Sequence, residues 1–366
     1  MKTGAKTIIL TILYIVIFVA IGFFVYKYML PQFLNRTSGN DQEVTVSNED
    51  KIYFYTANNI YKTSPSLDTA RIDQGPSQKV LSNINLGKIS TDQKKENLFL
   101  ENTVNFHSEI WSLNFSSNLS RKIVFSETPG LENFTDFSNP KVSNDGKKLL
   151  FTAKNSQSNY LYQIDTKSYK TIDNLSLNIA LENVLDYKWG NSTNLILVLR
   201  QKDAKYYIDE VNLTNNKVTS LYNGEDKILS FDTQDEKIFA LLEKTENNQK
   251  NVNLYELLDS KFGKKTFLSF PITIKSFAPM TVTGKFMIIS QNETSNETQL
   301  LQFSTISEKI LELTPSGDYD TPVFSPDEAD LAYWTKDEGV FKTNLKTKKA
   351  SKILNSIAEG NLLIWR

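Results

Sequence analysis

Short hydrophobic runs recur along the chain from residue 51 to the C-terminus. Each run covers about six residues, and many runs alternate between apolar and polar positions. Clusters of Asn, Asp, Gly, Ser and Lys separate them. Alternation with a period of two and turn-forming boundaries are typical of β-strands, and this region has no convincing helical periodicity. The pattern therefore predicts an all-β body.

The strand runs fall into repeating units of four. The clearest unit begins at Thr321, as TPVFSPDEADLAYWTKDEGVFKTNLKTKKASKIL, and a second begins at Asn139, as NPKVSNDGKKLLFTAKNSQSNYLYQIDTKSYKTI. Each contains a first strand, a tight turn rich in Asp, Asn, Pro or Gly, and three further strands. The same rhythm appears in seven second-strand runs, which start at Ile52, Leu98, Leu149, Leu195, Ile238, Phe286 and Leu331.

A four-stranded unit that recurs about every 46 residues is typical of a β-propeller. We therefore predict a single ring of about seven four-stranded blades, with six or eight blades as alternatives. The first unit lacks a first strand before Ile52, and the last run, Asn361 to Arg366, resembles a first strand alone. Because closure removes the exposed sheet edges of an open ring, we expect the C-terminal strand to enter the first blade.

An apolar segment precedes the repeats. Thr7 to Tyr26 contains no charged residue, and a helix of that length spans roughly 30 Å, the thickness of a hydrocarbon core. The run is longer than the apolar part of a typical cleaved signal peptide, which is the alternative. We therefore predict a transmembrane signal anchor over residues 7–28, a short N-terminus over 1–6, a linker over 29–50 and the propeller over 51–366.

The charges around this segment predict its orientation. Lys2, Lys6 and the terminal amine precede it, whereas Lys27 and Arg36 follow it, so the bias is slight. Positive charge tends to stay in the cytoplasm, which favours an N-terminus inside the cell. We expect a single-pass protein of the cell membrane whose propeller is extracytoplasmic.

The composition limits the kinds of functional site that the chain can form. There are 41 basic and 42 acidic residues among 366, a balance that argues against nucleic-acid binding. The chain has no Cys, which excludes disulfides, thiolate metal sites and cysteine nucleophiles. His107 is the only histidine, and it lies between predicted strands rather than in a catalytic motif. We predict no catalytic residue, no cofactor site and no metal site.

One segment of the clearest unit resembles a known family. GDYDTPVFSPDEADLAYW, Gly317 to Trp334, resembles the repeat of the TolB-like propellers and also the blades of prolyl-oligopeptidase-type propellers. The family repeat has a Ser-Pro-Asp-Gly turn; residues 325–327 match it, and Glu328 replaces Gly. In the unit from Asn139, Asn144 replaces Pro, and the other units are degenerate. The resemblance implies a propeller in the cell envelope, although the TolB family usually has six blades.

Acidic residues with aromatic neighbours precede three of the first strands. Because every blade repeats the same strand direction, we expect these residues to cluster at one end of the ring. An aromatic ring beside a carboxylate suits a peptide, through apolar contact and charge-assisted hydrogen bonds. Polar turn residues are the alternative explanation for each acid. The predicted partner-binding residues are Asp136, Phe137, Asp186, Tyr187, Asp318, Tyr319 and Asp320.

The function that these observations favour is binding rather than catalysis. The TolB-like resemblance implies a non-catalytic envelope module that holds a protein or peptide, or that acts as a scaffold. One alternative is an envelope hydrolase of glycans or esters with carboxylates at the propeller channel. Another is a sensory ectodomain, which would have only the short segment 1–6 on the cytoplasmic side of the membrane.

Overall fold

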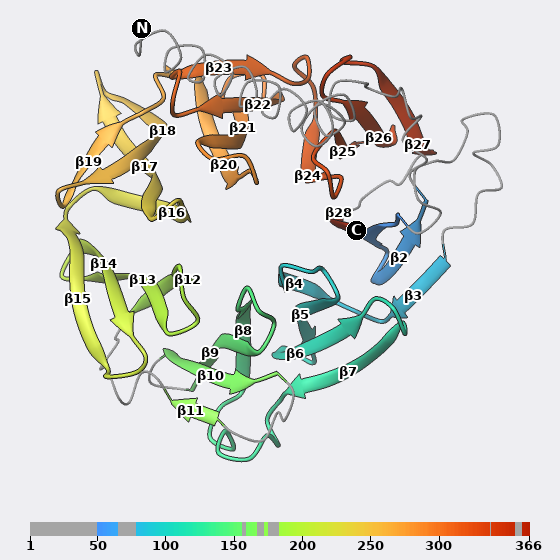
Figure 1. Cartoon of the computed structure of the whole chain (residues 1–366), viewed down its shortest axis with the longest axis vertical. Helices are drawn as coiled ribbons and strands as arrows, with labels where there is room; N and C mark the ends of the chain where they lie inside the picture. Colours follow the sequence, from blue (N-terminus) through green and yellow to red (C-terminus); the bar gives the residue numbers. More distant parts are fainter. Residues whose placement is uncertain are drawn as a thin grey trace, which may run out of the picture. The chain divides into compact units, whose positions relative to one another are not determined.

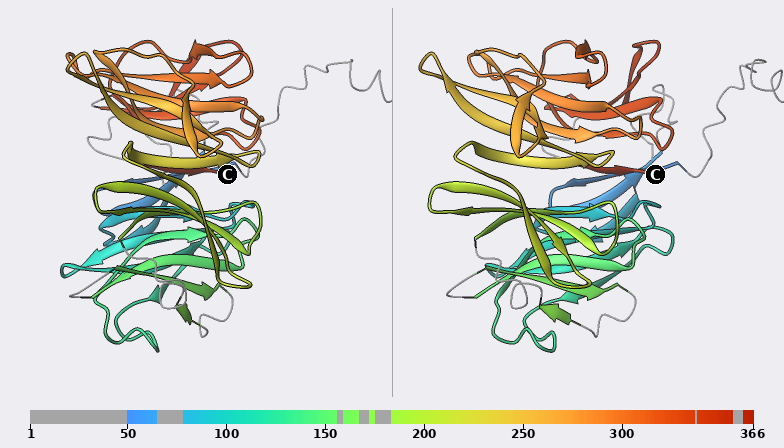
Figure 2. Two further views of the ribbon diagram at one scale, coloured as in Figure 1. Left: turned by 90° about the vertical axis from the view of Figure 1, so that its left-hand side faces the viewer. Right: turned by 60° about the vertical axis from the view of Figure 1, so that its left-hand side comes forward.

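Seven four-stranded antiparallel sheets stand as blades around a central axis (Figure 1). The computed structural model describes residues 50–64, 78–155, 159–166, 172–174, 183–336, 338–355 and 361–366. Seen from the side, the blades stack around the ring with their sheet faces toward one another (Figure 2). The predicted all-β propeller of seven blades is confirmed.

The first blade combines the two ends of the repeat region. From the inside outward it contains β28 (Asn361–Trp365), β1 (Ile52–Thr56), β2 (Asn59–Thr63) and β3 (Gln78–Ser82). β28 pairs with β1 in antiparallel register, with Ile52 opposite Trp365. Two backbone hydrogen bonds between Lys51 and Arg366 extend the pairing. The predicted closure of the ring by the C-terminal strand is confirmed.

The other six blades follow the order of the chain, each from its inner strand to its outer strand. Blade 2 contains β4 (Leu86–Thr91), β5 (Asn97–Val104), β6 (His107–Asn114) and β7 (Leu119–Val124). Blade 3 contains β8 (Asp136–Val142), β9 (Lys148–Lys154), β10 (Asn159–Asp165) and β11 (Ile172–Asn174). Blade 4 contains β12 (Val184–Trp189), β13 (Leu195–Lys202), β14 (Lys205–Asn212) and β15 (Lys217–Gly224).

The last three blades complete the ring. Blade 5 contains β16 (Lys227–Gln234), β17 (Lys237–Glu246), β18 (Gln249–Leu258) and β19 (Lys261–Lys264). Blade 6 contains β20 (Ile272–Pro279), β21 (Lys285–Asn292), β22 (Thr298–Ser304) and β23 (Lys309–Glu312). Blade 7 contains β24 (Tyr319–Phe324), β25 (Asp330–Thr335), β26 (Gly339–Asn344) and β27 (Ala350–Asn355). The predicted second-strand runs are β1, β5, β9, β13, β17, β21 and β25.

The hydrophobic core lies between blades rather than inside a central cavity. Within the described residues, each of seven clusters joins two neighbouring blades. Phe99 and Phe137, for example, come from blades 2 and 3 and belong to one cluster. The second strands are covered on both faces by neighbouring blades, which explains why their sequences are continuous apolar runs rather than alternating ones.

The two turns that resemble the family repeat use the same hydrogen bonds. The Ser143 hydroxyl donates to Asp145 at 2.7 Å and accepts from the Lys148 amide at 3.0 Å. Ser325 and Asp327 repeat the first of these bonds at 2.6 Å, and this bond holds the pKa of Asp327 below its usual value. The Ser-x-Asp pattern therefore stabilises the turn in both blades.

The predicted membrane anchor, residues 7–28, and its flanking segments 1–6 and 29–49 lie outside the described residues. Among the residues that the structure describes, no helix is long and apolar enough to cross a membrane. The anchor, the linker and the extracytoplasmic location of the propeller therefore stay predictions.

Candidate functional site

The seven inner strands define two ends of the ring. All of them begin at one end, which we name the start face, and end at the other, which we name the finish face. Every inner strand skips one or more residues in its pairing with the second strand of its blade. A β-bulge of this kind leaves a residue unpaired and redirects its side chain.

Bulges in three adjacent blades expose side chains at the start face. In blades 4, 5 and 6 the skipped residue occupies the same register position, and it is Leu185, Leu229 and Lys275 respectively. Leu185 is 46% exposed, Leu229 is 44% exposed, and Lys275 is also exposed. The start face thus displays two leucines and a lysine from neighbouring blades. The local sequence gives no sign of these bulges.

The predicted acidic residues all lie at the start face, but they do not form one cluster. Asp136 begins β8, Asp186 lies in β12, and Asp318 and Asp320 lie at the start of β24. Blades 3 and 4 are neighbours, whereas blade 7 is adjacent to neither of them. Asp186 accepts a hydrogen bond from the Asn139 side chain of blade 3 at 3.1 Å. The structure therefore brings the first two acids together and leaves the other two apart.

Asp136 also holds the neighbouring blade. It accepts hydrogen bonds from the Ser108 backbone amide at 3.3 Å and from the Thr135 hydroxyl at 3.2 Å. His107 Nδ1 lies 3.6 Å from the same carboxylate, and the histidine side chain is 60% exposed. His107 is the first residue of β6, next to the turn that the sequence predicts. Part of the role of Asp136 is therefore to join blade 3 to blade 2.

The aromatic half of the predicted face needs correction. Phe137, Tyr187 and Tyr319 are buried, none more than 9% exposed, and each belongs to a core cluster between blades. The Tyr187 hydroxyl donates to the Asn139 carbonyl of the neighbouring blade. These residues lie within strands, not in loops, and successive side chains of a strand point to opposite sides. A residue next to a solvent-facing carboxylate is therefore directed into the core.

A cavity of about 350 Å³ opens at the start face between blades 2, 3 and 4. Charged side chains of both signs line it, together with the bulged leucine of blade 4. They are Lys88, Glu101, Asp136, Lys154 and Leu185. Glu101 accepts a hydrogen bond from the Asn139 backbone amide at 3.1 Å. The cavity offers both charge and apolar contact to a ligand.

The turn between β5 and β6 adds an aromatic ring to the start face. Asn105 and Phe106 have φ values of 49° and 69°, a conformation typical of a two-residue hairpin turn and best suited to Gly at the second position. Phe106 is 98% exposed. Sequence reasoning missed this residue, although Asn-Phe between two strand runs marks the turn that exposes it.

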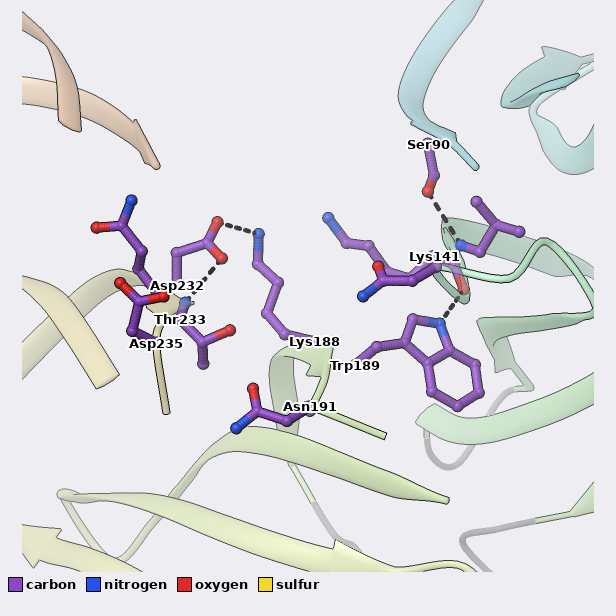
Figure 3. Close-up of a pocket in the computed structure, with 12 residues that line it drawn as sticks. Ser90, Lys141, Lys188, Trp189, Asn191, Asp232, Thr233 and Asp235 are labelled. Atoms are coloured by element: carbon purple, nitrogen blue, oxygen red, sulfur yellow. Dashed lines mark hydrogen bonds and ion pairs between the residues drawn. The ribbon is translucent and has the colours of Figure 1, made fainter. Parts of the chain in front are cut away.

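A second cavity, of about 330 Å³, lies at the finish face between blades 2, 3, 4 and 5 (Figure 3). Ser90, Lys141, Lys188 and Asp232 line it from corresponding register positions of four adjacent inner strands. Lys188 Nζ lies 2.9 Å from Asp232 Oδ2. Lys141 and Lys188 are separated by one repeat length in the sequence, which is the signal that could have revealed them.

Hydrogen bonds between blades shape this cavity. The Trp189 indole N–H donates to the Lys141 carbonyl at 2.8 Å, and the Val142 amide donates to the Ser90 hydroxyl at 3.0 Å. Among the described residues, no group of three or more His, Cys, Asp or Glu side chains could hold a metal ion. The chemistry available here is that of amines, carboxylates, hydroxyls and amides.

Comparisons with known proteins support the fold. No protein-family profile and no curated protein sequence matches the chain. Solved structures that match include a prolyl endopeptidase, with a TM-score of 0.57 and 9% identity over 82% of this chain and 49% of that one. An oligogalacturonate lyase from Vibrio parahaemolyticus has a TM-score of 0.55 and 8% identity over 83% and 85%. A TolB from Agrobacterium tumefaciens has 0.50 and 12% over 72% and 88%.

These similarities concern the propeller alone. The chain spans about half the length of the prolyl endopeptidase that it matches. The resemblance to TolB-like and prolyl-oligopeptidase-type propellers is confirmed as a likeness of fold. TolB proteins and enzymes both occur among the matches, and one fold supports many functions, so the fold by itself assigns neither binding nor catalysis.

Proposed function

We propose that the protein is a non-catalytic module of the cell envelope that binds a protein or peptide through its start face. In this proposal, residues 7–28 hold the chain in the membrane, and the propeller lies on the extracytoplasmic side. The apolar, uncharged run in the sequence and the TolB-like fold support this location.

The observation that carries the binding proposal is the exposure of Leu185 and Leu229 at matching bulges of adjacent blades. Burial of these leucines against a partner would remove apolar surface from water, which favours association. Leu185 also lines the start-face cavity, where Asp136 offers a carboxylate to amide or ammonium donors. Apolar contact would then supply affinity, and the carboxylates would orient the partner.

Site-directed photo-crosslinking in intact cells tests this function on the full, anchored chain. A photo-reactive residue replaces Leu185 or Leu229 in one set of variants. The matched control replaces Leu258, which is 49% exposed at the end of β18, on the finish face. We expect a discrete adduct from the two start-face positions and none from Leu258. Equal adducts from Leu258, or none from the start face, would contradict the proposal.

Charge removal in the same assay separates the acids. Asp136→Asn with Asp186→Asn should lower the adduct yield from Leu229, because both acids lie beside Leu185, which the same partner would contact: Asp136 lines the cavity with Leu185, and Asp186 follows Leu185 in β12. Asp320→Asn, in blade 7, should leave the yield unchanged. The amide oxygen of Asn still accepts the hydrogen bonds made to each carboxylate. The free energy of unfolding should therefore change by about 1 kcal/mol or less, and the melting temperature should change little. An undiminished yield from a well-folded double variant would exclude a role for these carboxylates.

A further inference from the structure

The finish-face cavity contains an ammonium group without a counter-ion. Lys188 forms its ion pair with Asp232, whereas no carboxylate or other acceptor in the described part of the chain lies within bonding distance of the Lys141 ammonium. Figure 3 shows the Lys188–Asp232 pair on one side of the cavity, with Ser90, Lys141 and Trp189 on the other. The two lysines thus occupy equivalent positions, but among the described residues only Lys188 has an ion-pair partner.

Charged groups face Lys141 from three neighbouring inner strands. β4 contributes Lys88, β12 contributes Asp186 and Lys188, and β16 contributes Asp232. The cavity itself is lined by two lysines and two aspartates, Asp235 being the fourth charged group, and among the described residues the one ion pair between them joins Lys188 and Asp232. Burial is the main reason that the pKa of Lys141 falls to about 8, and the nearby Lys188 lowers it further. A bound anion would offset this unfavourable environment.

Neutral groups around Lys141 suit an anionic ligand. The Ser90 oxygen accepts from the Val142 amide, which leaves the hydroxyl hydrogen free to donate. The side chains of Asn144 and Asn191 also line the cavity, and each carries an amide donor group. The indole N–H of Trp189 is already bonded to a backbone carbonyl, so its ring can serve as an apolar wall.

We propose that the finish-face cavity binds a carboxylate, with Lys141 as the counter-ion and Ser90 as a hydrogen-bond donor. Lys141 is the lining ammonium without an ion-pair partner among the described residues, and one carboxylate would supply one negative charge to it. A phosphate dianion would leave negative charge beside Asp232 and Asp235, which both line the cavity. A volume of about 330 Å³ admits a peptide C-terminus or a small organic acid rather than a folded surface. This site is separate from the start face and does not depend on the function proposed for it.

Competitive acetylation of the full chain in lipid nanodiscs tests the site. Acetic anhydride reacts with the unprotonated amine, and mass spectrometry compares Lys141 with the exposed Lys346 in the same sample. If carboxylate binding raises the pKa of Lys141 by about one, labelling at pH 7 should fall about tenfold. The probes are acetate, an N-acetylated dialanine with a free C-terminus, the same peptide amidated, and inorganic phosphate.

The four probes distinguish the possible ligands. Protection by the free peptide but not by its amide supports binding of a chain end, and protection by acetate alone supports binding of small acids. Equal protection by phosphate, or no protection by either carboxylate at saturating concentration, overturns the proposal. Ser90→Ala should weaken protection several-fold without altering Lys141 itself. An S90A variant that is protected as fully as the native protein would remove Ser90 from the site.

Discussion

The start face and the finish face are built from the same seven inner strands, yet they offer different chemistry. At the start face, Asp136 and Asp186 accept hydrogen bonds from blades 2 and 3, and bulged leucines are exposed. At the finish face, Lys188 is paired with Asp232, and the Lys141 ammonium has no such partner among the described residues. Asp136 and Asp186 therefore connect neighbouring blades, whereas in our proposal Lys141 binds a ligand.

This difference shows how a repeated fold acquires distinct sites. The backbone places one residue of each blade at the same height around the channel, so neighbouring blades decide whether a charge is compensated. Lys188 has Asp232 in the next blade, whereas Lys141 is followed by Lys188. Each substitution within a repeat therefore changes a junction between blades as well as a surface.

Opening the ring, on which both faces depend, should have the largest effect on stability. Deletion of residues 361–366 removes β28, whose Trp365 is 2% exposed between blades 7 and 1. Loss of this tryptophan alone costs about 3 to 5 kcal/mol, comparable with the net stability of a domain. We expect the truncated chain to lose its cooperative thermal transition, measured by circular dichroism. A truncated chain that melts within a few degrees of the native protein would show that closure is not required.

Neutralisation of the uncompensated lysine should stabilise the protein in a pH-dependent way. The pKa of Lys141 is about 8 in the folded state and 10.5 ordinarily, so the unfolded chain binds more protons between these pH values. Native stability therefore rises with pH across this window, and the charge is unfavourable below it. Lys141→Met should add up to about 3 kcal/mol at pH 7, and this gain should fall below about 0.5 kcal/mol at pH 10.5.

Denaturant titrations at pH 7 and pH 10.5 measure this effect. Lys346→Met is the matched control, because it removes an exposed ammonium from the turn after β26. The control should change stability little at either pH. A gain from K141M that is equal at both pH values would indicate improved apolar packing rather than loss of an unfavourable charge.

The smallest expected effect is at the start face, where one substitution distinguishes a change in stability from a change in binding. Phe106→Gly creates Asn-Gly at a turn with φ values of 49° and 69°, which should add about 0.5 to 1 kcal/mol. Ala204→Gly in the matching turn of blade 4 gives the same backbone relief without removing an aromatic ring. If Phe106 contacts the partner, F106G should lower the crosslinking yield from Leu185 while A204G does not. Equal yields from both variants would exclude Phe106 from the interface.

Most of the fold could be predicted from local patterns. The seven second strands are continuous apolar runs because two neighbouring blades cover each of them, and such runs are visible in a single sequence. Closure followed from the missing first strand before Ile52 and the lone strand at Asn361. The Ser-x-Asp turns at Ser143 and Ser325 were recognisable because their hydrogen bonds join residues only two positions apart.

The candidate sites depended on contacts that no local pattern records. The sequence placed Asp136 and Asp186 at one face but suggested that Phe137 and Tyr187 share it, whereas strand alternation directs these rings into the core. Exposure of Leu185 arises from a bulge, which is a feature of register between two strands. The partner of Lys188, and the lack of one for Lys141 within the described chain, were decided only when the closed ring placed residues about one repeat apart side by side.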